Sequence, residues 1–347
     1  MKLKTIADTL LNEASSPADL RAALNAFAQL CSGVGGVVPD PSFNAWADDS
    51  LLKDGVAISP EAAAHCVSDT QRTVVFIRAA FAAITAAKQR FANSPIEVLY
   101  AGCGPFATLL LPLLTKFNPG ELVVHLLDIH QRSLDCVALL IGHFDLQEHR
   151  ISYIQDDACH YQHSSNPHVI ITETMQKSLE QEPQFAVTAK LAPQLHARGI
   201  FIPQRIEVAL CLAKLEEETA AFQRGNAPDP NALAEAGKRH PLATVLCLTP
   251  ENAATLKQQA SQNSHGLLEL NPMQVTIPAT ADLHNFEAVL FTRIRAFEQH
   301  WLLDYESEIT LPLRCRELTP LQAGDRYRIG LQIGSYPRFS VTRLRDG

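Results

Sequence analysis

Between Ile96 and Pro203 short apolar runs alternate with stretches of helical periodicity, and this alternation limits the fold more than any other feature. The runs have the length of strands and read IEVLYAG, ELVVHLLDI, RISYIQDDA, HVIITET and GIFIP. Helical stretches lie between them, among them QRSLDCVALLIGHF and ATLLLPLLTKF, the second kinked at Pro112. Strands that alternate with helices predict a parallel, doubly wound sheet. Ligands bind such sheets at the carboxyl ends of the strands.

The chain before this region has a helical character. SSPADLRAALNAFAQL combines a Ser or Asp N-cap with apolar residues three and four apart. Ser59 and Pro60 then provide an N-cap and a proline at the first helical position. The apolar periodicity that follows runs to about residue 91 and predicts one long helix or two.

The chain after Pro203 has the pattern of antiparallel sheet. RIEVALCLAKL reads as a strand, and from about Met273 the alternating runs are MQVTIPAT, FEAVLFTRIRAF, YESEITLPLRC, DRYRIGLQIG and RFSVTRL. Such runs predict strands with one solvated face, in a sandwich or a barrel. We therefore expect an α/β protein with an N-terminal helical region at 1–95, a Rossmann-like doubly wound domain at 96–203, and a β-rich domain at 204–347 with a helical insertion near 213–242.

Composition excludes several classes of function. The net charge of −8 argues against a general binder of nucleic acid or anionic membranes, since either would need a basic face. No apolar run reaches the roughly 18 residues of a transmembrane helix, and MKLKTIADTLLNEASS lacks the apolar core of a signal peptide. The eight cysteines form no CxxC pair and read as reduced core thiols of a cytoplasmic protein. The histidines and cysteine at 159–168 match no ligand spacing, so we expect no metal site.

Three strand ends carry the residues that a nucleoside would need. The turn Gly102–Cys103–Gly104 follows the first strand, where glycines let backbone N–H groups approach a ligand closely. Asp128 ends the second strand and is placed to accept from both ribose hydroxyls. Asp156 and Asp157 end the third strand, where a carboxylate can accept from an adenine amino group. Each feature alone also suits strand–helix packing or a surface acid, but together they favour an adenosine ligand.

This set resembles the class I S-adenosylmethionine (SAM) methyltransferases. The resemblance implies that Gly102 and Gly104 lie under the methionine part of SAM, that Asp128 binds the ribose, and that residues 156–158, ending in Ala158, lie beside the adenine. The third glycine of a dinucleotide-binding G-x-G-x-x-G motif is absent. An NAD-dependent dehydrogenase is therefore disfavoured.

One further stretch resembles the two-glutamate hairpin of protein arginine methyltransferases. In ETMQKSLEQEP, Glu173 and Glu182 are nine positions apart and Met175 lies two after the first, as in that family. Two carboxylates can clamp a guanidinium, and one can localise its charge to expose a nucleophilic nitrogen. Glu182, close to Glu180, also suits a helix-start acid.

Two other segments extend this resemblance. SDTQRT matches the family's Asp-x-x-Arg-Thr helix through Asp69, Arg72 and Thr73, which implies that Arg72 pairs with the methionine carboxylate of SAM. A solvated helix face is the alternative for this arginine. In DLHNFEAVLF, His284 takes the histidine position of the family's Thr-His-Trp loop, although the threonine and tryptophan are missing.

The resemblance implies a SAM-dependent N-methyltransferase acting on a guanidino or amino group, expected in a small cationic molecule or amino acid. It allows a homodimer. Tyr100 replaces the acid that usually opens the glycine motif, and Phe106 stands near its third glycine. Bulky walls beside the methionine tail leave two alternatives open. One is an enzyme that cyclises this tail to a small cyclic amino acid and methylthioadenosine, and the other is a non-catalytic SAM-binding protein.

Overall fold

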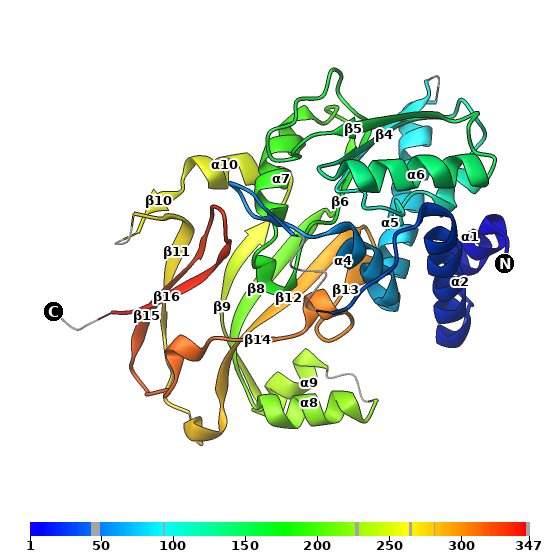
Figure 1. The fold of residues 1–347 in the computed structure, drawn as a ribbon. Helices are drawn as coiled ribbons and strands as arrows, with labels where there is room; N and C mark the ends of the chain where they lie inside the picture. Colours follow the sequence, from blue (N-terminus) through cyan, green and yellow to red (C-terminus); the bar gives the residue numbers. More distant parts are fainter. Residues whose placement is uncertain (43–48, 93, 226–228, 264–265, 281, 345–347) are drawn as a thin grey trace.

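The computed structural model describes residues 1–347 except 43–48, 93, 226–228, 264–265, 281 and 345–347. Strands in the described part form one five-stranded parallel sheet, two antiparallel sheets and a two-stranded ribbon. Helices gather at the N-terminal side and around the parallel sheet, so the predicted mixed α/β class is confirmed (Figure 1). Among the described helices, none has the length and apolarity needed to cross a membrane.

The N-terminal segment contains the helices α1 (Leu3–Leu11), α2 (Pro17–Gly35), α4 (Pro60–His65) and α5 (Thr70–Arg90) and the ribbon β1 (Ser50–Leu51) with β2 (Val56–Ala57). The predicted caps are present, since Ser16 accepts from the Asp19 N–H and Ser59 from the Ala62 N–H. The long periodic stretch is two helices, because the 3-10 turn η1 (Cys66–Ser68) intervenes and Asp69 caps α5 through the Arg72 N–H.

The parallel sheet has the strand order β5–β4–β3–β6–β7, formed by Arg150–Gln155, Leu122–Asp128, Ile96–Ala101, Val169–Thr172 and Ile200–Ile202. Residues alternate between its two faces. Val98 packs in the core that includes α5 and α6 (Gln131–His143), whereas Leu99 packs in a second core with α7 (Gln184–Leu191) and η4 (Ala192–Gln194). Helices on both faces are the doubly wound arrangement expected from the alternating sequence.

The expected helix over ATLLLPLLTKF is wrong. The chain from Gly104 to Leu111 makes consecutive turns, and only the 3-10 helix η2 (Pro112–Lys116) follows. Ala107 adopts a positive φ of 41°, which is outside the helical region. Pro112 has no N–H to donate into a helix and its ring crowds the preceding turn. A wall of closely packed turns therefore follows the glycine motif.

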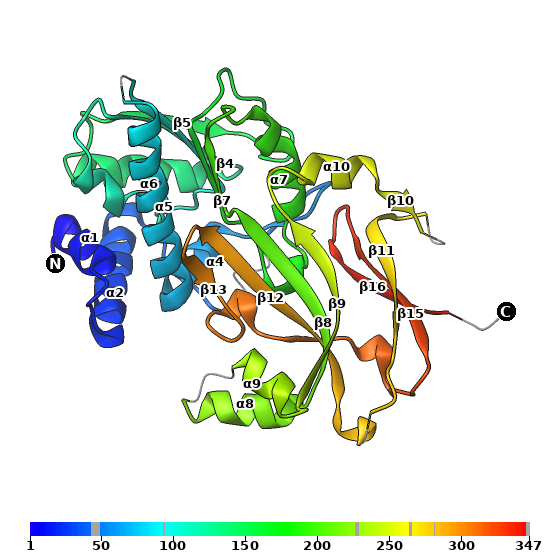
Figure 2. The same ribbon diagram turned by 180° about the vertical axis from the view of Figure 1, so that it is seen from behind.

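The C-terminal part is antiparallel, as its alternating runs predict. One sheet has the order β13–β12–β8–β9, formed by His300–Leu302, Glu287–Phe297, Arg205–Ala213 and Arg239–Leu248, with β14 (Leu313–Arg314) also paired to β12. The other has the order β10–β11–β15–β16, formed by Ser261–Gln262, Leu268–Thr276, Arg326–Gln332 and Arg338–Leu344. Figures 1 and 2 show these sheets as an open half-barrel beside the parallel sheet, on the side away from α1.

Two details of this region differ from the expected pattern. YESEITLPLRC is not one strand: it contains η6 (Glu308–Thr310) and the two-residue β14, and η7 (Arg316–Leu318) follows. Strand β9 was not among the expected runs. The helices α8 (Leu215–Gln223) and α9 (Pro230–Glu235) lie between β8 and β9 and project away from the parallel sheet (Figure 1), near the predicted insertion. Helix α10 (Ala253–Gln258) joins the two sheets.

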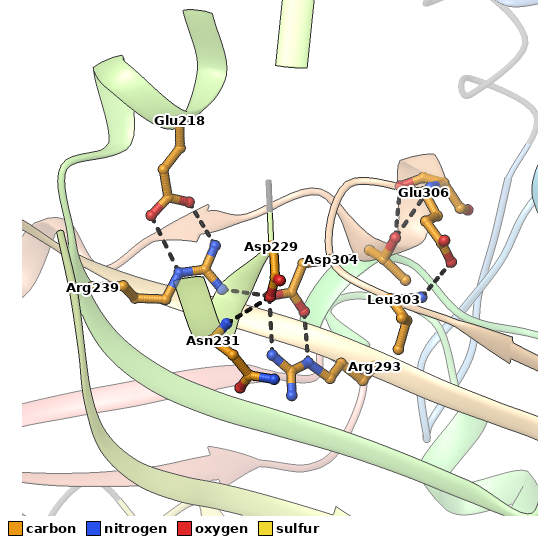
Figure 3. A network of polar contacts seen from close by, with 10 residues as sticks. Glu218, Asp229, Asn231, Arg239, Arg293, Leu303, Asp304 and Glu306 are labelled. Carbon is orange, nitrogen blue, oxygen red and sulfur yellow. Dashed lines mark hydrogen bonds and ion pairs between the residues drawn. The ribbon is translucent and has the colours of Figure 1, made fainter. Parts of the chain in front are cut away.

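A buried ionic cluster fixes the chain that follows β13. The guanidinium of Arg239 lies between Glu218 and Asp304, with Nη2 2.6 Å from Glu218 Oε2 and Nη1 2.5 Å from Asp304 Oδ2 (Figure 3). Arg293 donates from Nε to the other oxygen of Asp304 at 2.8 Å, and the Tyr305 hydroxyl donates to Glu218. These contacts join α8, β9 and β12 to Asp304 and Tyr305.

Candidate functional site

A cavity lies at the carboxyl ends of β3, β4 and β6, with about 1,010 Å³ of unfilled space including its open mouth. Strand ends, the glycine turn, α4, α5, Leu52 and residues 56–58 line it. The structure brings eleven of the residues singled out in the sequence to this one cavity: Arg72, Tyr100, Gly102, Gly104, Phe106, Asp128, Asp156, Asp157, Ala158, Glu173 and Glu182. This is the edge of the sheet at which ligands bind doubly wound folds.

The glycine turn needs glycine at both positions. Gly102 has a φ of +70°, and a Cβ there would lie 2.5 Å from Thr174 Cγ2. Gly104 has a φ of +62°, and its N–H donates to Asp128 Oδ2 at 2.8 Å. The other oxygen of Asp128 accepts from the His130 N–H at 2.9 Å. The backbone of two strand ends therefore holds the Asp128 carboxylate in place at the cavity.

The third strand contributes a pair of acids at the rim. Asp156 is exposed, and its Oδ1 accepts from the Asp157 N–H at 2.8 Å. Asp157 Oδ1 accepts from the Cys159 N–H at 2.8 Å and so closes the turn that contains Ala158. Local hydrogen bonds thus fix both carboxylates beside Asp128 at the same sheet edge.

Arg72 and Glu173 form a buried ion pair inside the cavity. Arg72 Nε donates to Glu173 Oε2 at 2.9 Å, and Nη2 contacts the same oxygen. Burial lowers the pKa of Arg72, but the charge of Glu173 outweighs it and the net change is upward. Burial raises the pKa of Glu173, with the pull of Arg72 opposing. Glu173 Oε1 is buried and has no hydrogen-bond partner in the described chain.

Glu182 lies close to this pair and is 6% exposed. Burial and, after it, the negative charge of Glu173 raise its pKa to about 8, while the positive charge of Arg72 opposes both effects. The group formed by Arg72, Glu173 and Glu182 therefore has one positive charge for two carboxyl groups. With one carboxylate paired to Arg72, the second carboxyl holds its proton at neutral pH unless another cation enters.

The loop between the two glutamates has an unusual backbone. Ser178, Leu179 and Gln181 have φ values of 56°, 56° and 65°, in the left-handed region that disfavours non-glycine residues. The Ser178 N–H donates to Thr292 Oγ1 at 3.0 Å and the Gln181 N–H to the Pro337 carbonyl at 2.8 Å. The antiparallel sheets therefore hold this loop, and with it the relative position of the two carboxyl groups.

The two bulky residues of the motif are wall residues. Tyr100 is 4% exposed on β3, and burial raises the pKa of its hydroxyl. Phe106 is 1% exposed and meets Phe27 of α2 edge to face, with ring centroids 6.3 Å apart. Phe106 thus joins the cavity wall to the N-terminal helices, which gives its size a packing reason.

His284 does not line the cavity. It is exposed in η5 (Leu283–Asn285), just before β12. The first residue of β12, Glu287, pairs with Ala213 at the far end of β8, whereas the residues of β12 nearest the parallel sheet pair with the start of β8. The histidine is therefore placed at the wrong end of β12 for the expected role.

A different C-terminal segment contacts the helix that contains Arg72, and the sequence did not indicate it. Ser307 Oγ donates to Asp69 Oδ2 at 2.6 Å, and the Glu308 N–H donates to the same oxygen at 2.9 Å. These partners are 238 and 239 positions apart in the chain. Such a distant contact leaves no local pattern, although the pairing of a helix-cap carboxylate with hydroxyl and N–H donors is ordinary chemistry.

No protein-family model matches the chain, and no curated protein matches it. Many solved structures are similar, among them the following two. One is the PRMT1 enzyme–prozyme heterotetrameric complex of Trypanosoma brucei with AdoHcy, at 14% identity and a TM-score of 0.48, over 81% of this chain and 96% of that chain. The other is protein arginine methyltransferase 10 of Arabidopsis thaliana in an open conformation, at 13% identity and a TM-score of 0.47, over 77% and 86%. The fold of this chain is established by its own strand order and pairing.

Proposed function

We propose that this protein is a SAM-dependent methyltransferase that acts on a guanidino or amino group of a small cationic compound. One observation carries the proposal: a single cavity joins the glycine turn and the acids of two further strand ends to a buried Arg72, Glu173 and Glu182. A nucleoside-binding edge and a place for an extra cation are what transfer of a methyl group from SAM to a basic nitrogen requires.

The residues present fit SAM. The positive-φ glycines 102 and 104 leave backbone open to a ligand, where a side chain at Gly102 would collide with Thr174. Each oxygen of Asp128 accepts one backbone N–H and keeps a second lone pair for a ribose hydroxyl. Arg72, beside the turn, offers a guanidinium to the methionine carboxylate. Bound SAM would supply an activated methyl group on its sulfonium.

The two glutamates would bind and orient the substrate. The partnerless Oε1 of Glu173 is ready to accept a hydrogen bond from an incoming N–H group. A cation beside Glu182 lowers its pKa, so this carboxyl loses its proton as the substrate binds. The pair would then offset the positive charge of the substrate and leave one nitrogen lone pair free to react.

The N-terminal ribbon supports a small substrate. Leu52, Val56 and Ala57 line the cavity, and the Val56 N–H donates to the Gln181 carbonyl at 2.8 Å. A Cβ at Gly55 would lie 2.8 Å from the Pro183 nitrogen, so the ribbon packs directly against the two-glutamate segment. This wall narrows the approach to Glu182 and favours a small compound over a folded protein.

We also propose a cytoplasmic location. All eight cysteines are free thiols and most are buried, which suits a reducing compartment. In the proposed assignment, residues 1–95 and 96–203 build the cofactor site and 204–347 complete the substrate site.

The test is incubation with SAM and a panel of guanidines and amines, followed by mass spectrometry of both products. S-adenosylhomocysteine with a methylated amine supports the proposal, whereas methylthioadenosine with a cyclic amino acid from SAM alone refutes methyl transfer.

Asp128→Ala should abolish SAM binding in calorimetry, and the exposed helix variant Asp135→Ala should not. Glu173→Gln should bind SAM and lose turnover. Unchanged SAM affinity in Asp128→Ala would reject the cofactor site.

A further inference from the structure

A second group of polar side chains gathers at the opposite end of β3 from the glycine turn. Glu97 of β3, His125 of β4 and His163 in the segment after β5 point their ligand-type atoms at one another. The Nε2 atoms of both histidines lie 3.1 Å from Glu97 Oε1. All three atoms lie within 4.8 Å of one another. Two imidazoles and a carboxylate therefore converge on one point.

Each histidine is oriented by a hydroxyl on its other ring nitrogen. His125 Nδ1 lies 2.8 Å from Ser152 Oγ, and His163 Nδ1 lies 2.8 Å from the Tyr161 hydroxyl. Outer hydrogen bonds of this kind fix the ring orientation and aim Nε2 in metal sites. The side chain of His163 is 1% exposed, whereas those of His125 and Glu97 are 17% and 22% exposed. The group is thus buried on one side and reachable on the other.

We propose that Glu97, His125 and His163 bind a divalent cation of the Zn²⁺ type. A tetrahedral ion with bonds of about 2.0–2.1 Å holds neighbouring ligand atoms roughly 3.3 Å apart, close to the two 3.1 Å separations here. Two imidazoles with one carboxylate favour Zn²⁺ over Ca²⁺ and Mg²⁺, because Ca²⁺ and Mg²⁺ bind oxygen ligands. A water would complete the fourth position. Ser165 Oγ, which donates to Glu97 Oε1 at 2.6 Å, would orient the carboxylate.

The ion would have a structural role. Glu97 lies five residues from Gly102, roughly 17 Å along an extended strand, so the ion is remote from the cavity. It would fasten β3 and β4 to the segment between β5 and β6, the segment that begins with Asp156 and Asp157 at the cavity rim. We expected no metal site because the histidines and cysteine at 159–168 have no ligand spacing among themselves. His163 instead meets partners from two other strands, and this site does not depend on the proposed function.

The test uses the whole protein after removal of metals with a chelator. We expect one Zn²⁺ per chain on reloading, and Co²⁺ should give the intense visible bands of a four-coordinate N/O site. Glu97→Gln and His125→Gln should each weaken Zn²⁺ binding by about 100-fold or more, because loss of a ligand exceeds the effect of an outer partner. His143→Ala, an exposed histidine on α6, should bind as the unmodified protein does.

Circular dichroism will show whether each variant is folded, and the Co²⁺ spectrum of the unmodified protein does not depend on any variant. The proposal is overturned if the unmodified protein takes up no stoichiometric Zn²⁺ or Co²⁺, which would leave Glu97 as the acceptor of a hydrogen-bond network only. It is equally overturned if folded Glu97→Gln retains full affinity.

Discussion

Replacing Glu182 with glutamine tests whether this buried carboxyl holds a proton in the folded, ligand-free protein. Burial and the neighbouring Glu173 raise its pKa from the ordinary 4.5 to about 8. Between these values the folded protein keeps a proton that the unfolded chain has released. The contribution of Glu182 to stability is therefore complete below pH 4.5 and is lost as the pH rises to about 8. Glutamine resembles the protonated carboxyl in shape and does not titrate.

The interval from 4.5 to about 8, at about 1.4 kcal/mol per pH unit, gives a ceiling of about 5 kcal/mol for this loss. Between pH 5 and pH 8 the ceiling is about 4 kcal/mol, and entry of water on ionisation reduces it, so we expect Glu182→Gln to gain about 2–4 kcal/mol on the unmodified protein over this range.

The assay is urea unfolding of both proteins at half-unit steps of pH, without SAM or substrate. Glu216→Gln, an exposed carboxylate on α8, controls for the loss of one negative charge. If the stability difference between Glu182→Gln and the unmodified protein stays constant from pH 5 to pH 8, Glu182 is ionised in the folded protein and the charge argument for the cavity fails. The same variant should lose turnover, so a gain in stability would accompany a loss of activity.

Two further substitutions test the backbone and the ionic cluster. Gly102→Ala should destabilise the protein by about 2 kcal/mol or more and weaken SAM binding, because its φ is positive and the new Cβ meets Thr174 at 2.5 Å. Urea denaturation and calorimetry measure the two effects. The control is Gly33→Ala on α2, which has open space around it and should be neutral or slightly stabilising. Arg239→Ala should cost about 3–5 kcal/mol of unfolding free energy, because it leaves the buried Glu218 with only the Tyr305 hydroxyl and Asp304 with only Arg293 among their partners in the cluster. Lys238→Ala, which breaks an exposed pair, should change the free energy by less than about 1 kcal/mol. Equal effects of the two substitutions would contradict the role of burial.

The strand ends could be predicted because their signals are local. Asp128 follows its own apolar run directly, and parallel strands bring successive carboxyl ends to one edge. The prediction of a helix after the glycine turn was wrong for a reason that is also local. The run is apolar and helix-like, but Pro112 interrupts it.

Contacts between distant segments could not be predicted. The Asp69 carboxylate contacts Ser307, which is 238 positions away in the chain, and nothing near either residue in the sequence marks the other. The expectation for His284 rested on a short sequence similarity. Where this residue lies depends on how β12 pairs with β8, which the sequence around it does not show. The contact between Glu97 and His163 could not be predicted either. It forms because the segment after β5 passes close to the start of β3.

The loop between Glu173 and Glu182 has a consequence for how its geometry is maintained. Three non-glycine residues with positive φ cost about 1–3 kcal/mol each, so the loop would relax to another shape if released. Thr292 of β12 and Pro337, in the connection between β15 and β16, hold it from more than 100 positions later in the chain. The spacing of the two carboxyl groups therefore depends on the C-terminal antiparallel part of the chain. A substitution on β12 can retune which cation fits without touching either glutamate.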